Sequence, residues 1–540
     1  MSKKIIFGDE AKKTLQTGVD AVANAVKSTI GPKGQNVAYD KGYGGPTISN
    51  DGVSIAREIV LEDSLENIGA NIIKEIAQKT NDNAGDGTTT SVVLAQSIFT
   101  EGLKRISVGI SSMGIKSGIE KASKVAVEYL KSIAKPIKGG DETTQVATIS
   151  AESEEIGKII SDTISKLGSD AVITVETSPT VGITSEVSQG MEFDSGYISP
   201  YMITDPDRQE AECKDVSILV TDHKIGAVQE LVPFLESFMG SGKKELVVIA
   251  EDIIGEALQT FIVNKLRGAI TVVGIKAPGF GARKKDYLED IAVLTGATFV
   301  SNEVGINLDQ ITSEHLGSAD RVVSTKDKTT IIGGKGDKAK IKERIANARA
   351  EMEKNESKHD KLKVGERIAQ LSDGVAIIKV GAATETETNY LKLKIEDAVN
   401  SVKSALEEGI VAGGGTALIR ASIAVEEEMM KGEYTYDEKT GFEILSKAME
   451  TPLKQIAINC GIGDGSMIIS EVKNLIELNE NSGYDALNDL LVDDMIQAGI
   501  ADPVKVTRSA LENASSAAGT LLTTGCVMAE IPKEVDNTKK

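Results

Sequence analysis

The feature that most constrains the fold is a change of pattern along the chain, which is helical at both ends and mixed in the middle. Near the amino terminus, apolar residues recur at the spacing of one helix face, as at Leu15, Val19, Val22 and Val26. The middle carries short Val- and Ile-rich runs typical of buried strands, at 171–176, 217–221, 246–250 and 270–275. Helical patterns separate the last three runs and return after them. The sequence therefore predicts a discontinuous helical domain with an α/β domain inserted into it.

Composition excludes several classes of function. A chain of 540 residues is too long for one hydrophobic core, so about three or four domains are expected. The net charge of −21 repels a phosphate backbone, and no apolar run reaches the roughly 18 residues of a membrane span. The opening residues lack the apolar core of a secretory signal. We therefore expect no nucleic-acid partner and no membrane span.

Cysteine and histidine usage points in the same direction. The three cysteines, Cys213, Cys460 and Cys526, are far apart and form no CxxC pair, and the three histidines are equally scattered. This argues against a disulfide framework, a zinc site and a histidine-based triad. It suits the reducing cytoplasm, where we expect the protein to reside.

The most informative short motif is GDGTTT at residues 85–90, which places Asp86 between two glycines and before three threonines. One interpretation is a capping loop, in which Asp86 or a threonine caps a helix that begins near Ser91. The other is a cradle for phosphate and metal, because a helix N-terminus offers free N–H groups and a carboxylate can hold Mg²⁺. The motif alone leaves both interpretations open. No Walker A sequence is present.

Other segments could contribute to the same site. Gly31 and Pro32 end a helix, and Asp51 lies in a turn. Three glycines at 413–415 precede an apolar helix, which suits either a close approach to a ligand or packing of small residues. Asp397 lies off the apolar stripe of its helix, so the pattern alone favours a solvated acid over a carboxylate directed at phosphates.

The α/β segment has helical patterns at 225–239 and 254–266, and the second is apolar around well over half its circumference, more than one packing face requires. The additional apolar side chains either pack between layers of the domain or form an exposed patch that binds apolar partners. Possible hinge points flank the α/β segment and its connections, at Pro136, Gly190, Gly374 and Gly409. Ordinary loop glycines and a helix-breaking proline would give the same pattern.

Five longer motifs, in order along nearly the whole chain, resemble those of the bacterial group I chaperonins, the GroEL and Hsp60 type. They are TIGPKGQNV, NDGVSIAREI, NAGDGTTTSVVLAQ, IEDAVNSVKSALEEGIVAGGG and DPVKVTRSALENASSAAG. The resemblance implies a mostly helical equatorial ATP-binding domain at 1–135 and 409–540. It also implies a small intermediate hinge domain at 136–189 and 375–408. The apical domain, at 190–374, would be α/β, with sheet layers flanked by helices, and would bind substrate and co-chaperonin.

The resemblance also implies a function: an ATP-dependent chaperonin, an ATPase grouped with the isomerases, that refolds non-native polypeptides. Its subunits would form a homo-oligomer of seven-membered rings, usually two stacked back to back. An apolar apical rim would capture the polypeptide, and a co-chaperonin lid of the GroES type would close over it. ATP hydrolysis that depends on Mg²⁺ and K⁺ would time the cycle.

The site residues that the resemblance implies fall into four groups. Nucleotide would be bound by Thr29, Ile30, Gly31, Pro32, Asn50, Asp86, Gly87, Thr88, Thr89, Thr90, Gly414, Asp485, Ala486, Leu487 and Asp502. Within this set Asp86 would hold Mg²⁺, and Thr29, Asn50 and Thr89 would hold K⁺. Asp51 and Asp397 would orient and activate the attacking water. Non-native chains would be gripped by Tyr197, Tyr201, Met202, Val232, Leu235, Leu258, Ile262 and Val263. Gly190 and Gly374 would form an upper hinge, and Pro136 and Gly409 a lower one.

Some positions depart from the family pattern. Asp485 stands where an asparagine is usual, which alters the expected contact to the base. Asn50 replaces a frequent lysine, which alters the expected K⁺ coordination. Ser195 replaces an arginine, so an inter-subunit ion pair to Glu385 is expected to be lost. The final residues, PKEVDNTKK, lack the Gly-Met tail common in the family.

Two other functions compete with the chaperonin. A metabolic ATPase or kinase could use GDGTTT as a non-Walker loop, with the α/β segment as its substrate domain. A protein without enzymatic activity could bind apolar peptides. The sequence favours the chaperonin, because no acceptor pocket of a kinase is apparent in it.

Overall fold

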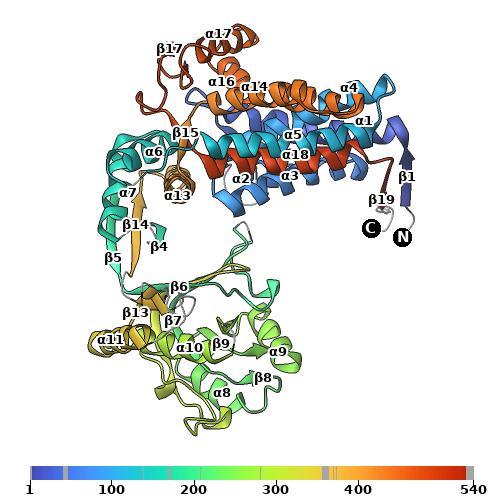
Figure 1. Cartoon of the computed structure of the whole chain (residues 1–540). Coiled ribbons are helices and arrows are strands. Elements are labelled where there is room, and N and C mark those ends of the chain that lie inside the picture. Colours follow the sequence, from blue (N-terminus) through green and yellow to red (C-terminus); the bar gives the residue numbers. More distant parts are fainter. Residues whose placement is uncertain are drawn as a thin grey trace. The chain divides into compact units, whose positions relative to one another are not determined.

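The chain folds into two compact units. The structure, a computed structural model, describes residues 3–40, 47–137, 139–167, 172–206, 208–279, 281–354, 364–365, 367–368, 370–371 and 374–530. The first unit, here called the helical unit, comprises Met1–Ser169, Val175–Thr184 and Lys379–Lys540. The second, the α/β unit, comprises Asp170–Thr174 and Ser185–Ile378. The predicted α/β insertion into a discontinuous helical domain is thus confirmed (Figure 1). The further division into equatorial and intermediate domains stays a prediction.

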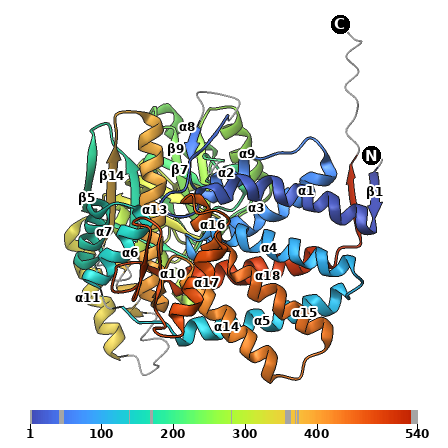
Figure 2. The same cartoon turned by 90° about the horizontal axis from the view of Figure 1, so that it is seen from above.

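Long helices from both ends of the chain build the core of the helical unit. They are α1 (Gly8–Val26), α3 (Ser64–Ala84), α4 (Thr88–Ser107), α5 (Ser112–Ser132), α14 (Thr416–Lys431), α15 (Tyr436–Met449) and α18 (Val504–Leu522). The last of these packs against α3, α4 and α5, so the C-terminal helix lies among N-terminal ones (Figures 1 and 2). Leu15, Phe99 and Phe442 are fully buried in this core.

Glycine allows two of these helix pairs to approach closely. A Cβ atom on Gly69 of α3 would collide with the backbone carbonyl of Leu15 in α1. One on Gly118 of α5 would collide with the carbonyl of Glu438 in α15. Part of the abundant glycine of this chain therefore serves helix packing, where any larger residue would force the two backbones apart.

The helical unit also contains short antiparallel ladders, two of which join segments that lie far apart in the chain. β1 (Lys3–Phe7) pairs with β19 (Cys526–Glu530), which ties the two ends of the chain together (Figure 1). The other ladders of this unit are β2 (Val37–Tyr39) with β3 (Thr47–Ser49), β15 (Ile410–Ala412) with β18 (Ala501–Pro503), and β16 (Gly483–Asp485) with β17 (Leu490–Val492). The β15–β18 ladder and the β16–β17 hairpin both contain residues predicted to bind nucleotide.

Further helices surround this core. They are α2 (Gly52–Glu58), α6 (Asp141–Ala151), α7 (Glu154–Leu167), α13 (Glu385–Glu408), α16 (Thr451–Asn459) and α17 (Ser466–Ile476). The helix with Asp397, α13, packs on α6 and α18. A three-stranded sheet in the order β4 (Val172–Thr177), β14 (Val375–Gly381), β5 (Gly182–Ser188) follows, and the chain passes from one unit to the other within these strands.

A six-stranded mixed sheet forms the centre of the α/β unit. Its order is β11 (Thr271–Lys276), β9 (Glu245–Ala250), β7 (Ala211–Val220), β12 (Gly317–Ser324), β13 (Thr329–Gly334), β6 (Gly190–Phe193). The first three strands are parallel and the rest antiparallel. Three predicted Val- and Ile-rich runs correspond to β7, β9 and β11, and the fourth to β4.

Helices cover both faces of this sheet. Val247 and Ile249 of β9 share a core with α10 (Ala282–Thr295), whereas the alternate residues Leu246 and Val248 share one with α8 (Val232–Gly240) and α9 (Gly255–Leu266). This alternation is that of a strand buried on both sides. The predicted helix at 225–239 begins later than expected, because β8 (Lys224–Ile225) pairs with β10 (Asp252–Ile253) and Pro233 occupies the first turn of α8.

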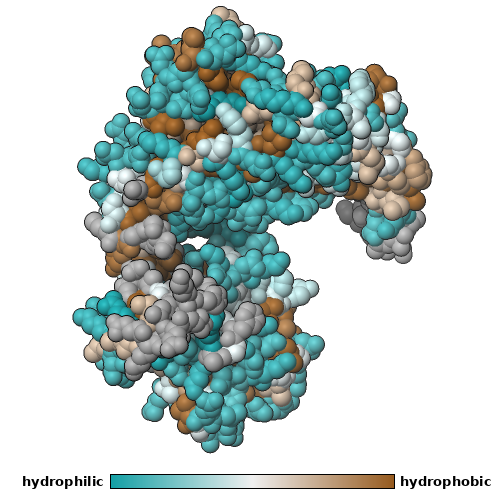
Figure 3. Space-filling view, in the orientation of Figure 1, coloured by the Kyte–Doolittle hydropathy of each residue, from teal (hydrophilic) through white to brown (hydrophobic). Residues whose placement is uncertain are grey.

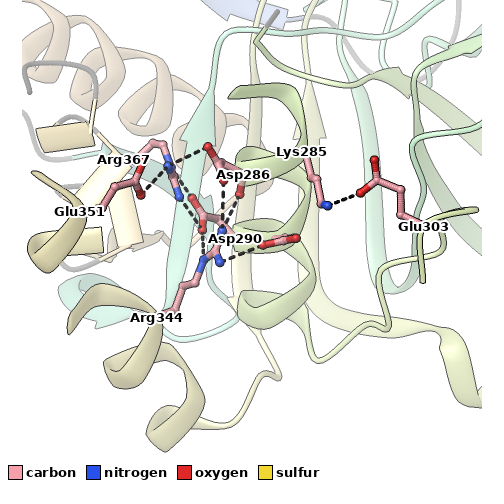
Figure 4. A network of polar contacts seen from close by, with 8 residues as sticks. Lys285, Asp286, Asp290, Glu303, Arg344, Glu351 and Arg367 are labelled. Carbon is pink, nitrogen blue, oxygen red and sulfur yellow. Dashed lines mark hydrogen bonds and ion pairs between the residues drawn. The ribbon is translucent and has the colours of Figure 1, made fainter. Parts of the chain in front are cut away.

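A buried ion network attaches α11 (Lys338–Lys354) to α10. Asp290 of α10 is fully buried, and it accepts hydrogen bonds from Nε of Arg344 at 2.6 Å and from Nε of Arg367 at 2.8 Å (Figure 4). Glu351 and Asp286 surround the same arginines. The side chain of one carboxylate thus lies between two guanidinium groups. Among the described residues, no helix is both long and apolar enough to cross a membrane.

Candidate functional site

The N-terminus of α4 has no side-chain cap. The helix begins at Thr88 rather than near Ser91, and its N-cap is Gly87, with φ +79°. The Asp86 carboxylate does not cap the helix as one interpretation predicted, since its Oδ1 accepts from the N–H of Gly87 at 2.5 Å. The first turn therefore presents N–H groups and a partial positive charge without a carboxylate or hydroxyl cap of its own. Such an end binds phosphate.

A second loop approaches this helix end closely. Asp51 caps α2 by accepting from the N–H groups of Val53 at 3.2 Å and Ser54 at 2.8 Å. The following residue, Gly52, lies against α4, because a Cβ on it would be 2.8 Å from the hydroxyls of both Thr88 and Thr89. Only glycine allows this approach, which carries Asp51 to the end of α4.

Thr29, from the end of the first helix, lies at the same place. Its hydroxyl is 3.4 Å from that of Thr89, and its side chain is buried. Gly31, with φ +87°, lies against Ile456 of α16, and Ile30 packs on the same small apolar cluster as Ala486. The predicted nucleotide residues at 29–31 therefore connect the threonines of α4 with the β16 region.

Asp397 reaches this site from α13. Burial, followed by the negative charges of Asp51 and Asp86, raises the pKa of Asp397 well above its usual value. Burial also raises the pKa of Asp86, against hydrogen bonds from Ser401, Gly87 and Ser150. Asp397 is therefore not the solvated acid that its helical pattern favoured. Its carboxyl lies close enough to Asp51 and Asp86 for their negative charges to raise its pKa.

Asp502 is a fourth carboxyl in this group. Burial and the nearby charge of Asp86 raise the pKa of Asp502 to about 7, although its carboxylate accepts from the N–H of Gly414. The β15–β18 ladder places it there by pairing Val411 with Asp502. Gly414 has φ +64° and lies beside Met495 and the carbonyl of Tyr484, which brings the glycine motif at 413–415 next to β16.

The segment at 485–487 turns back on itself. The Asp485 carboxylate accepts from the N–H groups of Leu487 at 3.0 Å and Asn488 at 3.2 Å, and from the Asn488 amide at 2.7 Å. The Ala486 carbonyl accepts a weak hydrogen bond from the Cys460 thiol at 3.4 Å. Ala486 is buried, whereas Leu487 is exposed. The carboxylate of Asp485, the residue that departs from the family pattern, therefore already accepts hydrogen bonds from the turn that follows it.

The four acids lack a positive partner. Within the described residues, none of these carboxyls forms an ion pair with lysine or arginine: Asp51, Asp86, Asp397 and Asp502. Lys394 lowers the pKa of Asp397 only weakly, as the smallest of five influences on it, and pairs with Glu152 at 2.6 Å. The described residues contain no cage of three or more acidic, histidine or cysteine side chains arranged to hold a metal.

The donors that are present fit Mg²⁺ nonetheless. Mg²⁺ prefers oxygen ligands, and in nucleotide sites it is commonly held by one or two carboxylates together with phosphate oxygens. Carboxylate and threonine oxygens converge at the α4 N-terminus, with Asp86 nearest to that helix end. Asp86 is therefore the residue best placed to hold the metal, and the hydroxyls of Thr29 and Thr89 are oxygen donors suited to K⁺.

Two contacts to Asp86 were missed by sequence reasoning. Its Oδ2 accepts hydrogen bonds from Ser150 of α6 at 3.3 Å and from Ser401 of α13. The only sequence signal is that Ser401 follows Asp397 by one helical turn and so shares its face. Serines are common on helices, so this spacing alone selects neither residue.

The predicted polypeptide-binding residues lie on or beside α8 and α9. Tyr201 is 70% exposed, Val263 41% and Val232 36%, and apolar surface is visible where α9 lies (Figure 3). The remaining members are half-buried, except Met202, which is fully buried. Met202 therefore differs from the expectation: its sulfur accepts from the N–H of Gly274 at 3.2 Å, beneath the surface. Met239, Ile254 and Leu266 add exposed apolar area on the same helices and were not assigned.

The structure places each pair of predicted hinge residues side by side. Next to Gly409, with φ +86°, Lys135 and Ile410 exchange two backbone hydrogen bonds, which sets Pro136 beside it. Gly374 has φ +69° and lies against the carbonyl of Ser188, while Gly190 lies against Val375. Each unit thus contains one pair. Their role as hinges stays a prediction.

The remaining departures are local. The Ser195 carbonyl accepts from the Thr329 hydroxyl at 2.6 Å, and Glu385 is the first residue of α13. The C-terminal sequence PKEVDNTKK lies outside the described residues. The loss of an ion pair at Ser195 stays a prediction.

Comparison with known proteins identifies the family and the fold of this chain. The family model described as TCP-1/cpn60 chaperonin family matches residues 22–233 and 231–532. Among solved structures, the chain is similar to the chaperonin gp146 from the bacteriophage EL 2 (Pseudomonas aeruginosa), a crystal structure in the presence of ATP-BeFx. The TM-score is 0.69 at 19% sequence identity, over 98% of this chain and 99% of that one, a likeness that shows the fold. Since the family model matches most of the sequence, this chain belongs to the TCP-1/cpn60 chaperonin family.

Proposed function

We propose that this protein is an ATP-dependent chaperonin of the bacterial group I type, acting in the cytoplasm as a ring-shaped homo-oligomer. The observation that carries the proposal is the convergence of four carboxyls on the uncapped N-terminus of α4, with no positive partner for them in the part of the chain that the structure describes. A phosphate chain with a divalent cation supplies both the anion that the helix end accepts and the positive charge that the carboxyls lack.

The residues of the chain divide the work of ATP hydrolysis. The N–H groups and hydroxyls of Thr88, Thr89 and Thr90 would bind phosphate oxygens, and Asp86 would hold Mg²⁺. When bound, the metal would neutralise charge on the phosphates. Asp51 and Asp397 would orient the attacking water and accept its proton. Because Asp397 comes from α13, ATP can bind before that helix completes the site.

The other side of the site would hold the nucleoside. Gly414 and Asp502 lie next to β16 and would contact adenosine, with 485–487 near the base and 30–32 along one edge. K⁺ would lie by the phosphates, near Thr29, Asn50 and Thr89. Since Asp485 is occupied by its own turn, we expect the backbone of this segment rather than the carboxylate to face the base.

The α/β unit would bind non-native polypeptides. Its α8 and α9 expose valine, methionine and leucine side chains, and Tyr201 is exposed beside α9; these suit a partner with apolar segments. By the family resemblance, a GroES-type co-chaperonin would close over the captured chain, and the subunits would form two stacked seven-membered rings. Movement about the hinge pairs would couple ATP hydrolysis to encapsulation.

Electron microscopy combined with an ATPase assay tests this proposal. We expect ring-shaped particles, hydrolysis of ATP that requires Mg²⁺ and rises with K⁺, and suppressed aggregation of a denatured protein. A monomer that hydrolyses ATP with no effect on unfolded protein would instead support a metabolic ATPase. A particle that binds unfolded protein without turning over ATP would support a simple peptide binder.

A further inference from the structure

α13 contacts the phosphate loop through a feature separate from Asp397. One helical turn after Asp397, the hydroxyl of Ser401 donates a hydrogen bond to Oδ2 of Asp86. The hydroxyl of Ser404 donates to the backbone carbonyl of Ala84 at 3.0 Å. Both serines are buried, with side chains on one face of the helix. The helix is therefore attached to both ends of the segment 84–86.

The residue between these two attachment points is shaped to fit α13. Gly85 has φ +70°, and a Cβ on it would collide with the side chain of Asn400. A larger residue there would lift the loop away from the helix and break both serine hydrogen bonds. Two hydroxyl contacts and one close approach thus occur within three consecutive loop residues.

We propose that Ser401 is a positioning residue for Asp86, and that Ser401 and Ser404 together form a hydroxyl latch that holds α13 on residues 84–86. The identity of what Asp86 binds rests on the proposed function; the latch itself does not. Because Asp397 and Ser401 lie on one helix, a single docking movement brings Asp397 to the site and orients the carboxylate of Asp86.

The orientation of Asp86 matters because a carboxylate can rotate to present either oxygen. Here Oδ1 is held by the Gly87 N–H at 2.5 Å, and Oδ2 by Ser401 and by Ser150 at 3.3 Å. Hydrogen bonds to a ligating carboxylate fix its direction, and removing such a partner typically costs about 10- to 100-fold in metal affinity or activity. Ser401 contributes the bond that depends on the position of α13.

Single-turnover ATP hydrolysis at varied Mg²⁺ concentration tests the positioning role. For Ser401→Ala we expect the rate of single-turnover hydrolysis at limiting Mg²⁺ to fall about 10-fold. Part of this fall should come from a slower hydrolysis step and part from a higher Mg²⁺ requirement. Ser401→Thr keeps a hydroxyl and should recover most of the loss. The matched control is Ser422→Ala in α14, a buried serine whose hydroxyl bonds only within its own helix, to Ile419 at 2.7 Å. It should behave as the unaltered protein does.

Hydrogen exchange of the nucleotide-free protein tests the latch without any turnover. Ser401→Ala and Ser404→Ala should each speed amide exchange in residues 84–91 and in α13, and the double variant should exchange fastest. Ser422→Ala should leave these segments unchanged. If the unaltered protein turns over no ATP, the proposed function is wrong, and this exchange measurement alone decides the latch.

Equal Mg²⁺ dependence and equal exchange in Ser401→Ala and Ser422→Ala would overturn the proposal. A slower hydrolysis in Ser401→Ala that Ser401→Thr does not restore would also contradict the proposal. That result would show that the volume of the side chain matters rather than its hydroxyl. Should Ser401→Ala fail to assemble, the threonine and Ser404→Ala variants provide the same comparison. Exchange in Ser404→Ala equal to that of the control would then overturn the latch.

Discussion

The two units treat carboxyl groups inside the fold in opposite ways: one is fully buried and paired, and the others are half-buried without positive partners among the described residues. In the α/β unit, Asp290 is fully buried and both Arg344 and Arg367 donate hydrogen bonds to it (Figure 4). In the helical unit, the acids at the α4 N-terminus have no such partner within the described residues; they are Asp51, Asp86, Asp397 and Asp502. In the α/β unit the negative charge is balanced by arginines of the chain itself. In the helical unit the negative charges require a positive group that is not part of the chain.

This difference separates a structural carboxylate from a functional one. A buried charge is costly unless it is paired, so a chain that leaves several acids unpaired retains a cost that folding alone does not remove. The raised pKa values of Asp86, Asp397 and Asp502 express that cost. Perturbed acids gathered in one place are typical of functional sites, and paired ones of structural networks.

The largest expected effect concerns Asp397. Asp397→Ala should leave ATP binding near normal and slow hydrolysis by about 100- to 10,000-fold, because binding precedes the step that needs the carboxylate. Asp397→Asn, which keeps the shape and removes the charge, should lose as much. Binding and single-turnover hydrolysis measured separately check this. Unchanged turnover in both variants would remove Asp397 from the mechanism and weaken the contrast between the units.

Substitution of Asp290, the structural carboxylate, should reduce stability rather than activity. Asp290→Ala leaves the buried guanidinium of Arg367 and the half-buried one of Arg344 without their shared partner and should destabilise the α/β unit by about 3–5 kcal/mol. Denaturant unfolding measures this, and ATP turnover under native conditions should change little. The control is Glu303→Ala, which breaks the exposed pair with Lys285 that Figure 4 also shows and should have little effect on stability. Equal stability of the two variants would contradict the structural role of Asp290.

The unpaired acids should make the nucleotide-free protein less stable as the pH rises. The pKa of Asp502 is raised from 3.8 to about 7, so the folded state retains a proton that the unfolded state releases, and stability falls between these values. Asp502→Asn should therefore stabilise the nucleotide-free protein above pH 7, on the order of 1 kcal/mol, and confer no advantage near pH 4. Thermal unfolding across this range checks it. A difference that does not vary with pH would exclude the carboxyl as its cause.

The smallest expected effect concerns the apolar surface of the α/β unit. Val263 is 41% exposed on α9, and Val263→Ser should weaken capture of an unfolded protein by about fivefold, or about 1 kcal/mol, with ATP hydrolysis unchanged. Val304→Ser alters an exposed valine on neither α8 nor α9 and is the matched control. If both variants bind equally well, the surface that binds polypeptide lies elsewhere. If ATP hydrolysis falls as well, the two units do not divide the work as proposed.

Sequence patterns predicted the architecture better than the details of the site. Helical periodicity and Val-rich runs report local burial, so the inserted α/β unit followed directly from them. The start of α4 was predicted too late: threonine is a weak helix former, so the sequence pattern did not indicate that the first turn includes Thr88. Met202 was expected at the surface because a motif does not record depth.

The acids of the site show what sequence patterns could not predict, namely which distant residues come together. Asp86 and Asp397 are far apart in the sequence, and neither pattern nor charge indicates that they meet. Their proximity depends on α13 packing over α6 and α18, and Ser401 gains significance only after that docking. Family motifs supplied Asp397, whereas the contact made by Ser401, a serine of the same motif, became apparent only from the coordinates.

The place of α18 in the core also bears on how the chain is synthesised. This helix, Val504–Leu522, packs against α3, α4 and α5, which leave the ribosome several hundred residues earlier. The α/β unit, almost one continuous segment, can complete its core during translation. The N-terminal helices must instead wait, with apolar faces uncovered, until nearly the last residues emerge. A subunit of a chaperonin is therefore exposed to aggregation for most of its own synthesis, and its slowest folding step is expected to be the closure of this long-range contact.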